Sequence, residues 1–391
     1  MTSFWENKPV KINSNTSKSL FQLYTNEKLL YKINTEILSN KIQLDHSIYT
    51  LQDLSDNKLN NVISFLNKNY ISSKDDKFKL IYTLDLFKFY CNDSLIIEFT
   101  PKYIDIHDRN DSHDRQKIVG YIIAKKKFLN VYNNNHVTVE VNFLCILQQL
   151  RKLGIAEYMI NILTRESILK YNVGMAHYTI SSQIKSPHFS KKNIYHIPIN
   201  IKNLINSGFL HNDCIKTKNY IETSDKYNYN KTLSIEYIHN SSVISQSKAS
   251  LLYNKYIDYC KKTYDIYEYI DITSFLKTFD NNDFYHFIVR NNHEIISYIC
   301  LFKLDTINIQ LNNSYKNGYL YNMFFEENII DSLEITLEYI YKNSIFDIIT
   351  LSDMFTFYYN RIIPGNGSLK YYLFNAELNS IENHKNGLIT I

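Results

Sequence analysis

The sequence is poor in the residues that interrupt regular structure, and it lacks the long apolar runs of membrane proteins. Its 391 residues include 8 glycines, 5 prolines and a single tryptophan. No apolar stretch is long enough to span a bilayer, and the start MTSFWENKPVK has no apolar region of the kind found in secretory signals. We therefore expect a cytoplasmic protein without stable membrane insertion.

Neither the cysteines nor the charge points to an extracellular or nucleic-acid-binding protein. The five cysteines are odd in number and form no C-x-x-C pair, which favours reduced thiols over disulfides. The formal net charge is +4, from 43 basic and 39 acidic residues, and this balance does not indicate a nucleic-acid partner. With 45% hydrophobic and 21% charged residues, the chain is globular and long enough for two domains.

One order of predicted elements occurs twice along the chain. In the first copy, strands are predicted at Leu95–Phe99, Lys117–Leu129 and Thr138–Leu147, and the Asn-rich run NVYNNNHV is predicted as a hairpin turn. A helix follows over about Ile155–Lys170, because apolar residues stand at positions 155, 158, 159, 162 and 163. A strand at Ala176–Ile180 closes this copy.

The second copy repeats this order nearer the C-terminus. An antiparallel pair, Phe284–Arg290 and Glu294–Leu304, is followed by a strand at Tyr319–Phe325. A helix over about Asn328–Tyr341 comes next, with one apolar stripe, and a strand at Phe346–Leu351 ends the copy.

A strand meander followed by a helix and a further strand is an α+β unit with a mixed sheet. Two such units in tandem indicate a pseudo-symmetric pair. We predict a division into residues 1–205 and 206–391, with the polar run Asn212–Lys231 crossing from one half to the other.

The two copies differ where the helix begins. Arg151, Lys152 and Gly154 precede the first helix, whereas Glu326 and Glu327 precede the second. A helix N-terminus has unpaired N–H groups and a positive dipole end, and glycine allows close backbone approach, so the first copy suits a phosphate. In a unit of this shape the phosphate would belong to coenzyme A. The same R-x-x-G-x-A pattern also occurs at ordinary helix boundaries, so the residues alone leave both possibilities open.

Four stretches, in the same order from residue 4 to residue 391, resemble the glycylpeptide N-tetradecanoyltransferase (N-myristoyltransferase) family. EVNFLC at 140–145, with LR at 150–151 and IA at 155–156, resembles the family signature E-[IV]-N-F-L-C-V-H-K-x-L-R. FW at 4–5 with PV at 9–10 resembles the opening F-W-x-x-Q-P-V. GNGSLKYYLFN at 365–375 resembles G-D-G-x-L-x-Y-Y-L-[YF]-N, and the end GLITI resembles the terminal G-[LV]-x-x-x.

This resemblance implies a fold and an activity. The family's fold is a pair of acetyltransferase-like (GNAT) halves. By this resemblance, residues 1–205 would hold myristoyl-CoA and residues 206–391 would hold most of the acceptor peptide. The implied enzyme is an acyltransferase that lipidates proteins by moving myristate from myristoyl-CoA to an N-terminal glycine amine, with no metal.

Matching positions give the residues that the resemblance implies for the acyl donor. Phe143 and Leu144 are implied to donate backbone N–H groups to the thioester oxygen, as an oxyanion hole. Phe4 and Trp5 are implied to close over the donor. The residues implied to line the coenzyme A phosphates and the pantetheine are Cys145, Ile146, Arg151, Lys152, Gly154, Ile155 and Ala156.

The nucleophile in this family is the substrate's glycine amine, and the base is the enzyme's terminal carboxylate, here that of Ile391. The amine has a pKa of about 8 and must lose a proton, whereas a carboxyl group with a pKa of about 3.5 is ionised at neutral pH and can accept one. The residues implied to contact the acceptor are Tyr70, Asp75, Phe78, Asn142, Thr179, His196 and Asn366, of which Asn142 and Thr179 would guide the amine.

Several positions depart from the family pattern. Asn366 replaces an Asp, and SSKD at 72–75 replaces a fuller carboxylate run, so a preference for basic residues in the acceptor is in doubt. Lys152 stands where the family has a small polar residue, and Gly154 where it often has a basic one. Cys145 lies within an apolar strand with no His or cation evident beside it, which is typical of an inert core residue.

Two other functions stay open from the residues alone. The apolar repeat and the R-x-x-G-x-A pattern also fit an N-acetyltransferase that uses acetyl-CoA, and the altered acidic positions fit a non-catalytic binder of acyl-CoA or acylated peptide. His107, Asp108 and His113 have spacings that metal ligands use, but a solvated hairpin loop also has this composition, and we expect no metal.

Overall fold

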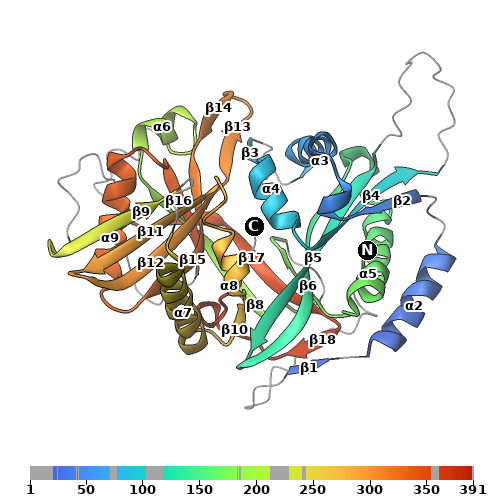
Figure 1. Ribbon diagram of the computed structural model, residues 1–391. Helices are drawn as coiled ribbons and strands as arrows, with labels where there is room; N and C mark the ends of the chain where they lie inside the picture. The colour runs from blue at the N-terminus through green and yellow to red at the C-terminus, as the bar shows by residue number, and fades with distance from the viewer. Residues whose placement is uncertain are drawn as a thin grey trace. The chain divides into compact units, whose positions relative to one another are not determined.

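A computed structural model gives the fold (Figure 1) and describes residues 21–23, 25–40, 42, 44–70, 77–102, 118–182, 184, 186–211, 229–239, 244–353 and 361–389. The chain forms two compact units: unit 1 comprises residues 1–70, 90–190 and 370–380, and unit 2 comprises residues 71–89, 191–369 and 381–391. These units are discontinuous, whereas the predicted halves 1–205 and 206–391 are each continuous. Most of the predicted crossing segment, 212–228, lies outside the described residues.

Unit 1 contains a mixed sheet in the order β2-β4-β5-β6-β7-β17, to which β17 contributes its C-terminal end. A small pair, β1 with β18, lies outside this sheet. The strands are β1 (Phe21–Leu23), β2 (Leu44–Tyr49), β4 (Ser94–Pro101), β5 (Gly120–Val131), β6 (Asn134–Ile146), β7 (Ala176–Ile180), β17 (Ile363–Phe374) and β18 (Ala376–Leu378). The helices are α2 (Asn26–Ser39), α3 (Asp56–Asn69) and α5 (Ile155–Tyr171), with 3-10 turns η1 (Leu51–Asp53) and η2 (Gln148–Leu150).

The helices of unit 1 cover both faces of its sheet. α5 packs on β4, β5 and β6, and α2 packs on α5 (Figure 1). The core on this face contains Ile122, Val139 and Met159, each at most 3% exposed. On the other face, Phe65 of α3 packs edge-on against Tyr121, with ring centres 5.2 Å apart. Neighbouring residues Tyr121 and Ile122 thus serve opposite faces, as the alternation of a strand requires.

In unit 2 the strands of the large sheet follow the order β17-β8-β16-β15-β12-β11-β9, and a small sheet has the order β14-β13-β3. The strands of this unit are β3 (Phe78–Ile81), β8 (Ser190–Pro198), β9 (Leu233–Ile238), β10 (Ile266–Glu268), β11 (Phe284–Asn291), β12 (Glu294–Lys303), β13 (Asp305–Asn308), β14 (Asn313–Tyr315), β15 (Asn317–Phe325) and β16 (Ile348–Ser352). Its helices are α6 (Ile201–Asn206), α7 (Gln246–Thr263), α8 (Ile272–Leu276) and α9 (Ile329–Lys342), with a 3-10 turn η5 (Asn383–Lys385). α4 (Leu84–Cys91) begins in unit 2 and ends in unit 1.

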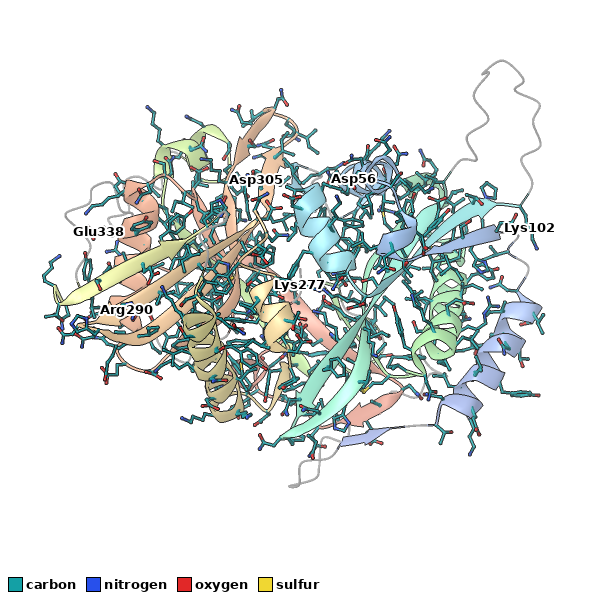
Figure 2. All side chains as sticks on the ribbon, viewed as in Figure 1. Asp56, Lys102, Lys277, Arg290, Asp305 and Glu338 are labelled. Carbon is teal, nitrogen blue, oxygen red and sulfur yellow. The ribbon has the colours of Figure 1, made fainter. Side chains whose placement is uncertain are left out.

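Helices cover both faces of the unit 2 sheet as well. Tyr298 of β12 packs against Phe275 of α8, with ring centres 5.8 Å apart, and α7 packs on α8. The next residue, Ile299, faces Leu333 and Leu337 of α9. Charged side chains such as Asp56 and Lys277 are exposed (Figure 2). Both units therefore bury their apolar side chains between a twisted sheet and flanking helices.

The predicted repeat is confirmed in both copies. β6 and β7, which precede and follow α5 in the chain, pair with each other in parallel. β15 and β16, which precede and follow α9, do the same. The helix that follows β6 begins at Ile155, as predicted, and the predicted apolar positions 155, 158, 159, 162 and 163 are all buried. The α+β fold class with a mixed sheet is therefore confirmed.

One predicted boundary is wrong: β6 begins at Asn134 rather than at Thr138. The polar residues before Thr138 continue the ladder with β5 as far as the pair Val131↔Asn134. The turn residues Tyr132 and Asn133 have φ angles of +48° and +67°. Two central residues with positive φ give the turn that matches the twist of a hairpin. The Asn-rich run therefore forms the predicted hairpin turn, and it also supplies part of the strand.

The two copies share a β-bulge on the strand before the helix. In the β12–β15 ladder the register passes from Leu301↔Leu320 to Cys300↔Asn322, so β15 carries one extra residue. In the β5–β6 ladder it passes from Ile123↔Asn142 to Tyr121↔Cys145, so β6 also carries one extra residue. A bulge at corresponding positions of both copies supports their origin in one repeated unit, and it bends each strand away from its parallel neighbour.

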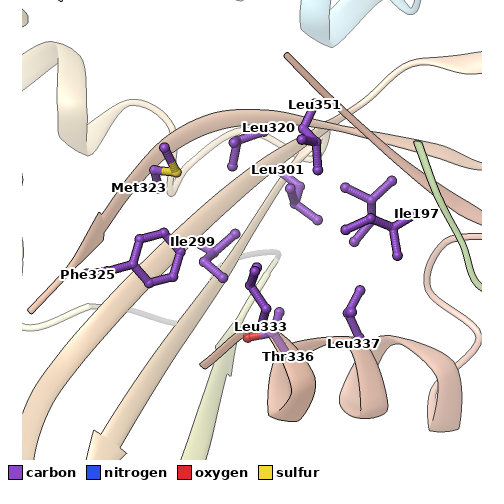
Figure 3. Close-up of a pocket in the computed structure, with 11 residues that line it drawn as sticks. Ile197, Ile299, Leu301, Leu320, Met323, Phe325, Leu333, Thr336, Leu337 and Leu351 are labelled. Carbon is purple, nitrogen blue, oxygen red and sulfur yellow. The ribbon is translucent and has the colours of Figure 1, made fainter. Parts of the chain in front are cut away.

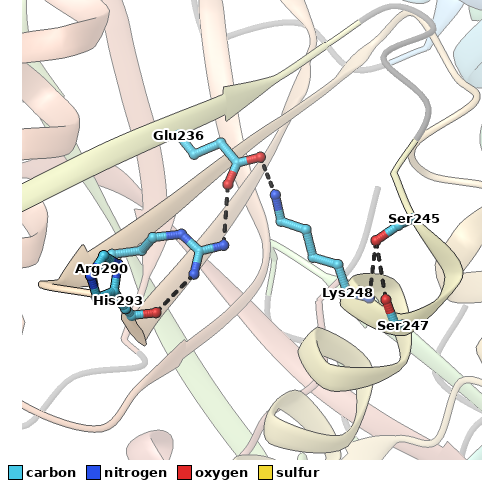
Figure 4. Close-up of polar contacts among 6 residues, drawn as sticks. All are labelled: Glu236, Ser245, Ser247, Lys248, Arg290 and His293. Carbon is cyan, nitrogen blue, oxygen red and sulfur yellow. Dashed lines mark hydrogen bonds and ion pairs between the residues drawn. The ribbon is translucent and has the colours of Figure 1, made fainter.

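Polar contacts bind the outer strands of unit 2 to α7 (Figure 4). Glu236 of β9 forms ion pairs with Lys248 of α7 and, at 3.3 Å, with Arg290 of β11. Ser245 caps α7, because its hydroxyl oxygen accepts a hydrogen bond from the Lys248 backbone N–H at 3.4 Å. The Glu236 side chain is 38% exposed, so we expect these pairs to contribute little stability beyond fixing the packing of β9.

A buried histidine in unit 2 makes stability depend on pH. Burial lowers the pKa of His286 from 6.5 to about 3, so the ring is neutral in the folded protein and protonates in the unfolded chain below pH 6.5. Stability is therefore lost as pH falls from 6.5 towards 3, by up to about 1.4 kcal/mol per pH unit for this group. We expect His286→Gln to make the dependence of the unfolding free energy on pH shallower by about this slope. Urea denaturation at pH 7, 5.5 and 4.5 measures it, and an unchanged slope would contradict burial of the neutral ring.

Candidate active site

The parallel strands β6 and β7 part from each other and leave a cavity in unit 1. Their register covers Val139↔Ala176 and Glu140↔His177. On its other side β7 pairs with β17 along its whole length, from Ala176 to Ile180. A cavity of about 290 Å³ lies where the strands part, with a mostly apolar wall. It is lined by Tyr70, Val141, Asn142, Phe143, Leu144, Ile160, Leu163, Thr164, Ala176, Tyr178, Thr179, Ile180 and Phe374.

The bulge of β6 forms one wall of this cavity. Phe143 and Leu144 together face the single residue Ile122 of β5, because of the register shift. Phe143 has a φ angle of +52°, in the left-handed region that costs a non-glycine residue roughly 1–2 kcal/mol. A strained backbone of this kind persists only where surrounding contacts hold it, and such strain is common at active sites.

Asn142 holds the strained backbone in place. Its side-chain oxygen accepts hydrogen bonds from the Phe143 N–H at 2.8 Å and from the Tyr70 hydroxyl at 3.0 Å. The Tyr70 ring also lies 5.4 Å from the Phe143 ring, and the Tyr90 ring lies 5.1 Å from it. Burial raises the pKa of Tyr70 well above its usual value, so the phenol remains a donor at neutral pH. The bulge therefore has a fixed geometry.

Because the Phe143 N–H already bonds to Asn142, the two expected oxyanion donors are not equivalent. An oxygen at the Phe143 N–H must share it with the Asn142 side chain or displace that side chain. Leu144 is the second residue of the bulge, and it follows the last regular pair, Ile123↔Asn142. We therefore expect Leu144 to be the first donor and Phe143 the second.

A buried polar cluster marks the point where the strands part. Lys127 and Glu140 form an ion pair at 3.6 Å, and their side chains are 8% and 5% exposed. His177, which pairs with Glu140 in the ladder, lies 3.5 Å from the Thr138 hydroxyl. Burial, reinforced by the Lys127 charge, lowers the pKa of His177 to about 3, so its ring is neutral. These contacts fix the register of β6 against β7 at the last pair before the two strands separate.

The predicted phosphate site forms the N-terminus of α5. Gly154 caps the helix with a φ angle of +81°, and Lys152 has a φ angle of +70°. Ile155 and Ala156 begin the first turn, whose N–H groups point out of the helix end. Arg151 is exposed, and its guanidinium donates to the carbonyl oxygens of Ile146 at 3.2 Å and Asn69 at 2.7 Å. Arg151 thus ties the helix entrance to β6 and α3.

Cys145 and Ile146 follow the bulge and are 2% and 9% exposed. Burial raises the pKa of the Cys145 thiol to about 12, although the Arg151 charge opposes this. At pH 7 its thiolate fraction is then roughly 1,000-fold below that of a cysteine with the ordinary pKa of 9.0. The thiol therefore has the character of a core residue rather than of a nucleophile.

This low thiolate fraction gives a chemical prediction for Cys145. We expect iodoacetamide to alkylate Cys145 at pH 7 at least about 1,000-fold more slowly in the folded protein than in the protein unfolded in urea. Mass spectrometry of the peptide that contains Cys145 measures both rates. Comparable rates would show a reactive thiol and would reopen an acyl-cysteine mechanism.

Three of the residues expected to contact the acceptor lie in unit 2. Phe78 and His196 both pack against Phe209, with ring centres 6.3 Å and 5.3 Å away. His196 also contacts the Thr350 hydroxyl at 3.0 Å, and burial lowers its pKa to about 4. Asn366, on β17, is exposed. Phe4, Trp5, Asp75 and Ile391 lie outside the described residues, as does the loop of His107, Asp108 and His113.

The second copy has a much smaller cavity at the corresponding place (Figure 3). A void of about 20 Å³ lies among the side chains of β12, β15, β16 and α9. It is lined by Ile197, Ile299, Leu301, Leu320, Met323, Phe325, Leu333, Thr336, Leu337, Ile349 and Leu351. This volume suits about one water molecule, and the walls are apolar. Of the two corresponding places, unit 1 alone therefore offers room for an apolar ligand.

Comparisons with known proteins agree with this geometry. Residues 26–190, which include the bulge and most of the cavity wall, match the family model of the Myristoyl-CoA:protein N-myristoyltransferase N-terminal domain. Over 409 aligned residues the chain is 24% identical to glycylpeptide N-tetradecanoyltransferase of Plasmodium falciparum, an alignment that covers 99% of this chain and 93% of that protein. Residues 26–190 are therefore similar to the N-terminal domain of N-myristoyltransferases, and nearly the whole chain aligns with one such enzyme.

A second glycylpeptide N-tetradecanoyltransferase and a solved N-myristoyltransferase structure also align with this chain. The chain is 26% identical over 366 residues to glycylpeptide N-tetradecanoyltransferase of Eremothecium gossypii, covering 85% of this chain and 76% of that one. A crystal structure of Saccharomyces cerevisiae N-myristoyltransferase with bound myristoyl-CoA superposes with a TM-score of 0.74 at 18% identity, covering 99% of both chains. The chain therefore has the N-myristoyltransferase fold, as the resemblance implied.

Part of the cavity wall was not predicted from the sequence. Ile160, Leu163 and Thr164 of α5 line it, as do Tyr178 and Phe374. The helical spacing of 160, 163 and 164 places them on one side of α5, but only the structure shows that this side faces a cavity. Phe374 lies within the GNGSLKYYLFN stretch that resembles a family motif, and this resemblance could have marked it as a site residue.

The described residues contain neither a membrane-spanning helix nor a cluster of metal ligands. No helix among them has the length and apolar character needed to cross a bilayer. Within the same residues, no three His, Cys, Asp or Glu side chains come together as metal ligands.

Proposed function

We propose that this chain is a glycylpeptide N-tetradecanoyltransferase of the cytoplasm, which moves myristate from myristoyl-CoA to the N-terminal glycine of acceptor proteins. The observation that carries the proposal is the cavity of about 290 Å³ beside the strained bulge of β6. It combines an apolar chamber with main-chain N–H groups at one wall, and it lies largely in the domain that matches the family model.

The cavity supplies the affinity for the acyl chain. Its wall includes Leu163 of α5, Ala176 of β7 and Phe374 of β17, all apolar. Burial of a methylene group contributes about 0.8 kcal/mol, so full burial of a fourteen-carbon chain contributes on the order of 10 kcal/mol. Because each methylene counts, a chamber of fixed depth selects chain length. The first turn of α5, with Lys152 and Gly154 before it, would hold the phosphates of the coenzyme A.

The bulge supplies the electrostatic part of catalysis. The glycine amine attacks the thioester carbonyl carbon, the oxygen gains negative charge, and the N–H groups of Leu144 and Phe143 stabilise it by a few kcal/mol per donor. The C–S bond then breaks and coenzyme A leaves as the thiol, while the amide forms. The Cys145 thiol is protonated at neutral pH because burial raises its pKa to about 12, and this supports direct attack without an acyl-enzyme.

The amine proton goes to the carboxylate of the last residue, Ile391, as in the family pattern. A carboxylate with a solution pKa of about 3.5 is ionised at neutral pH and can accept a proton from the glycine ammonium, which frees the amine to attack. A second proton passes from the nitrogen to the leaving sulfur, so the amide forms and coenzyme A leaves as the thiol. Asn142 and Thr179, both on the cavity wall, would guide the amine. Tyr70 is also on this wall, and Asp75, Phe78, His196 and Asn366 would contact the rest of the acceptor peptide.

A transfer assay tests the proposal. The protein is incubated with a peptide that begins with glycine and with acyl-CoAs of two to eighteen carbons, and the peptide is then weighed by mass spectrometry. Selective addition of a fourteen-carbon group supports the proposal. Transfer of acetyl alone would replace it with an N-acetyltransferase, and tight acyl-CoA binding with an unmodified peptide would replace it with a non-catalytic binder. A peptide that begins with N-methylglycine is the control for attack by a primary amine.

A further inference from the structure

The last described stretch of the chain, residues 381–389, is anchored in unit 2 by backbone hydrogen bonds and by buried side chains. The Gly387 N–H donates to the Ile266 carbonyl oxygen at 2.7 Å, and the Asp265 N–H donates to the Lys385 carbonyl oxygen at 2.8 Å. The Leu388 side chain is 3% exposed. A segment near a chain end is usually poorly ordered unless specific contacts hold it, so these contacts require an explanation.

Lys192 of β8 provides a contact that is unusual for a lysine. Its side chain is 0% exposed, and its ammonium donates to the carbonyl oxygen of Leu388 at 2.9 Å. Burial of an ammonium group costs several kcal/mol, and a lysine is almost never fully buried without partners. The transfer activity proposed above assigns no role to Lys192, although its amine is bonded three positions before Ile391.

Asp353, which is close to Lys192, favours the charged form of its amine and also fixes the terminal segment. Burial lowers the pKa of Lys192 to about 7, and the nearby Asp353 carboxylate opposes this shift. Asp353 accepts hydrogen bonds from the backbone N–H and the side-chain amide of Asn193, both at 2.8 Å, and from the side-chain amide of Asn383 at 3.2 Å. Because Asn383 belongs to the terminal segment, β8 and its neighbour β16 hold this segment at two points.

Gly387 shows how tightly the path of the segment is set. A β-carbon placed on Gly387 would lie 2.5 Å from the ring of Tyr264, which is itself 7% exposed. No real β-carbon approaches another atom so closely, so a larger residue at 387 must displace the ring or the chain. The chain therefore lies close against the Tyr264 ring at Gly387, one residue before the carbonyl oxygen that Lys192 contacts.

We propose that Lys192 is a positioning residue, whose buried ammonium grips the Leu388 carbonyl and thereby sets where the chain end lies during acyl transfer. This inference rests on the proposed function, in which the carboxylate at the chain end accepts the proton of the glycine amine. The grip acts through the main chain, so it does not depend on which side chains occupy positions 388–391. Lys192 itself touches no reacting atom in this account.

The test replaces Lys192 with methionine, which has a similar length and no donor, in the full-length chain. The control is Lys191→Met, since Lys191 is the adjacent residue of β8 and is exposed. Two kinds of measurement are made. The first is the rate at which carboxypeptidase Y releases Leu388, and the second is the kinetics of transfer (kcat and KM) with the Kd for myristoyl-CoA. We expect K192M to release Leu388 at least 10-fold faster and to lower kcat by about 10- to 100-fold, with the Kd for myristoyl-CoA within twofold of wild type. We expect K191M to change neither quantity.

The two readouts separate the possible failures. Unchanged release of Leu388 from K192M would overturn the grip, and faster release with unchanged kcat would overturn the positioning role. If wild-type protein transfers no myristate, the proposed function fails, but the release experiment still decides whether Lys192 holds the segment. Where K192M does not fold, Gly387→Ala displaces the same segment from the Tyr264 side and is expected to give the same pair of changes.

Discussion

Addition of one residue after Ile391 is expected to lower kcat by at least about 100-fold while the Kd for myristoyl-CoA stays within about twofold. An added residue moves the carboxylate by up to about 3.5 Å along the chain, and a displacement of 1 Å is enough to cost on the order of 100-fold in a well-oriented reaction. General base catalysis itself contributes about 100- to 10,000-fold. The acyl cavity is formed by unit 1 residues, so donor binding does not need the chain end.

Single-turnover kinetics with preformed donor complex measures this effect on the chemical step. Removal of Ile391 is also expected to lower kcat, because the new terminal carboxylate lies one residue short of the original position. Glu382→Gln is a matched control in the same terminal segment, since the Glu382 side chain is 77% exposed and lies outside the grip of Lys192. Wild-type turnover in both the extended and the shortened chain would remove the carboxylate from the mechanism.

Substitution of Ala176 by phenylalanine is expected to shift donor selectivity from fourteen carbons towards shorter chains. Ala176 lies on the cavity wall at the first residue of β7, which pairs with Val139 of β6, and is 7% exposed, so a larger side chain there fills space that the acyl chain would use. Exclusion of four methylene groups costs about 3 kcal/mol, which is about a 200-fold loss in kcat/KM for myristoyl-CoA. The kcat/KM for decanoyl-CoA is expected to fall far less, because its shorter chain does not need the filled space.

The ratio of kcat/KM values across acyl-CoAs of eight to sixteen carbons measures this shift. Overpacking also costs stability, typically 1–3 kcal/mol, so the melting temperature of each variant is measured beside its activity. Leu169→Phe is the matched control, because Leu169 is on α5 but 63% exposed. An equal loss for every chain length would show general damage, and an unchanged ratio would show that the acyl chain binds elsewhere.

The sequence predicted the parts of this site that depend on local pattern. The apolar spacing of α5 and the strand-helix-strand order of both copies were sufficient to place Gly154 at a helix start and Phe143 in the strand before it. These predictions succeed because side-chain burial follows a fixed period in helices and strands. The matched motifs then indicated that Asn142, Phe143 and Leu144 belong to the active site.

Other features of the site depend on contacts between residues that lie far apart in the sequence. Nothing in the letters N-F-L shows that Phe143 adopts a φ angle of +52°, because the extra residue of the bulge appears only when β5 is paired with β6. Residues 370–374 belong to unit 1 because they pair with β7, almost two hundred positions earlier, and a single division near residue 205 could not anticipate this. Lys192 was missed because a lysine in a polar stretch gives no sign of burial.

A crystal structure with a myristoyl-CoA analogue, in which a methylene group replaces the thioester sulfur and the carbonyl is kept, tests the central claim most directly. We predict that the analogue's carbonyl oxygen lies about 3 Å from the Leu144 nitrogen. We also predict that its alkyl chain fills the cavity between β6, β7 and α5. An alkyl chain bound outside this cavity, or a carbonyl oxygen directed away from the bulge of β6, would contradict the account.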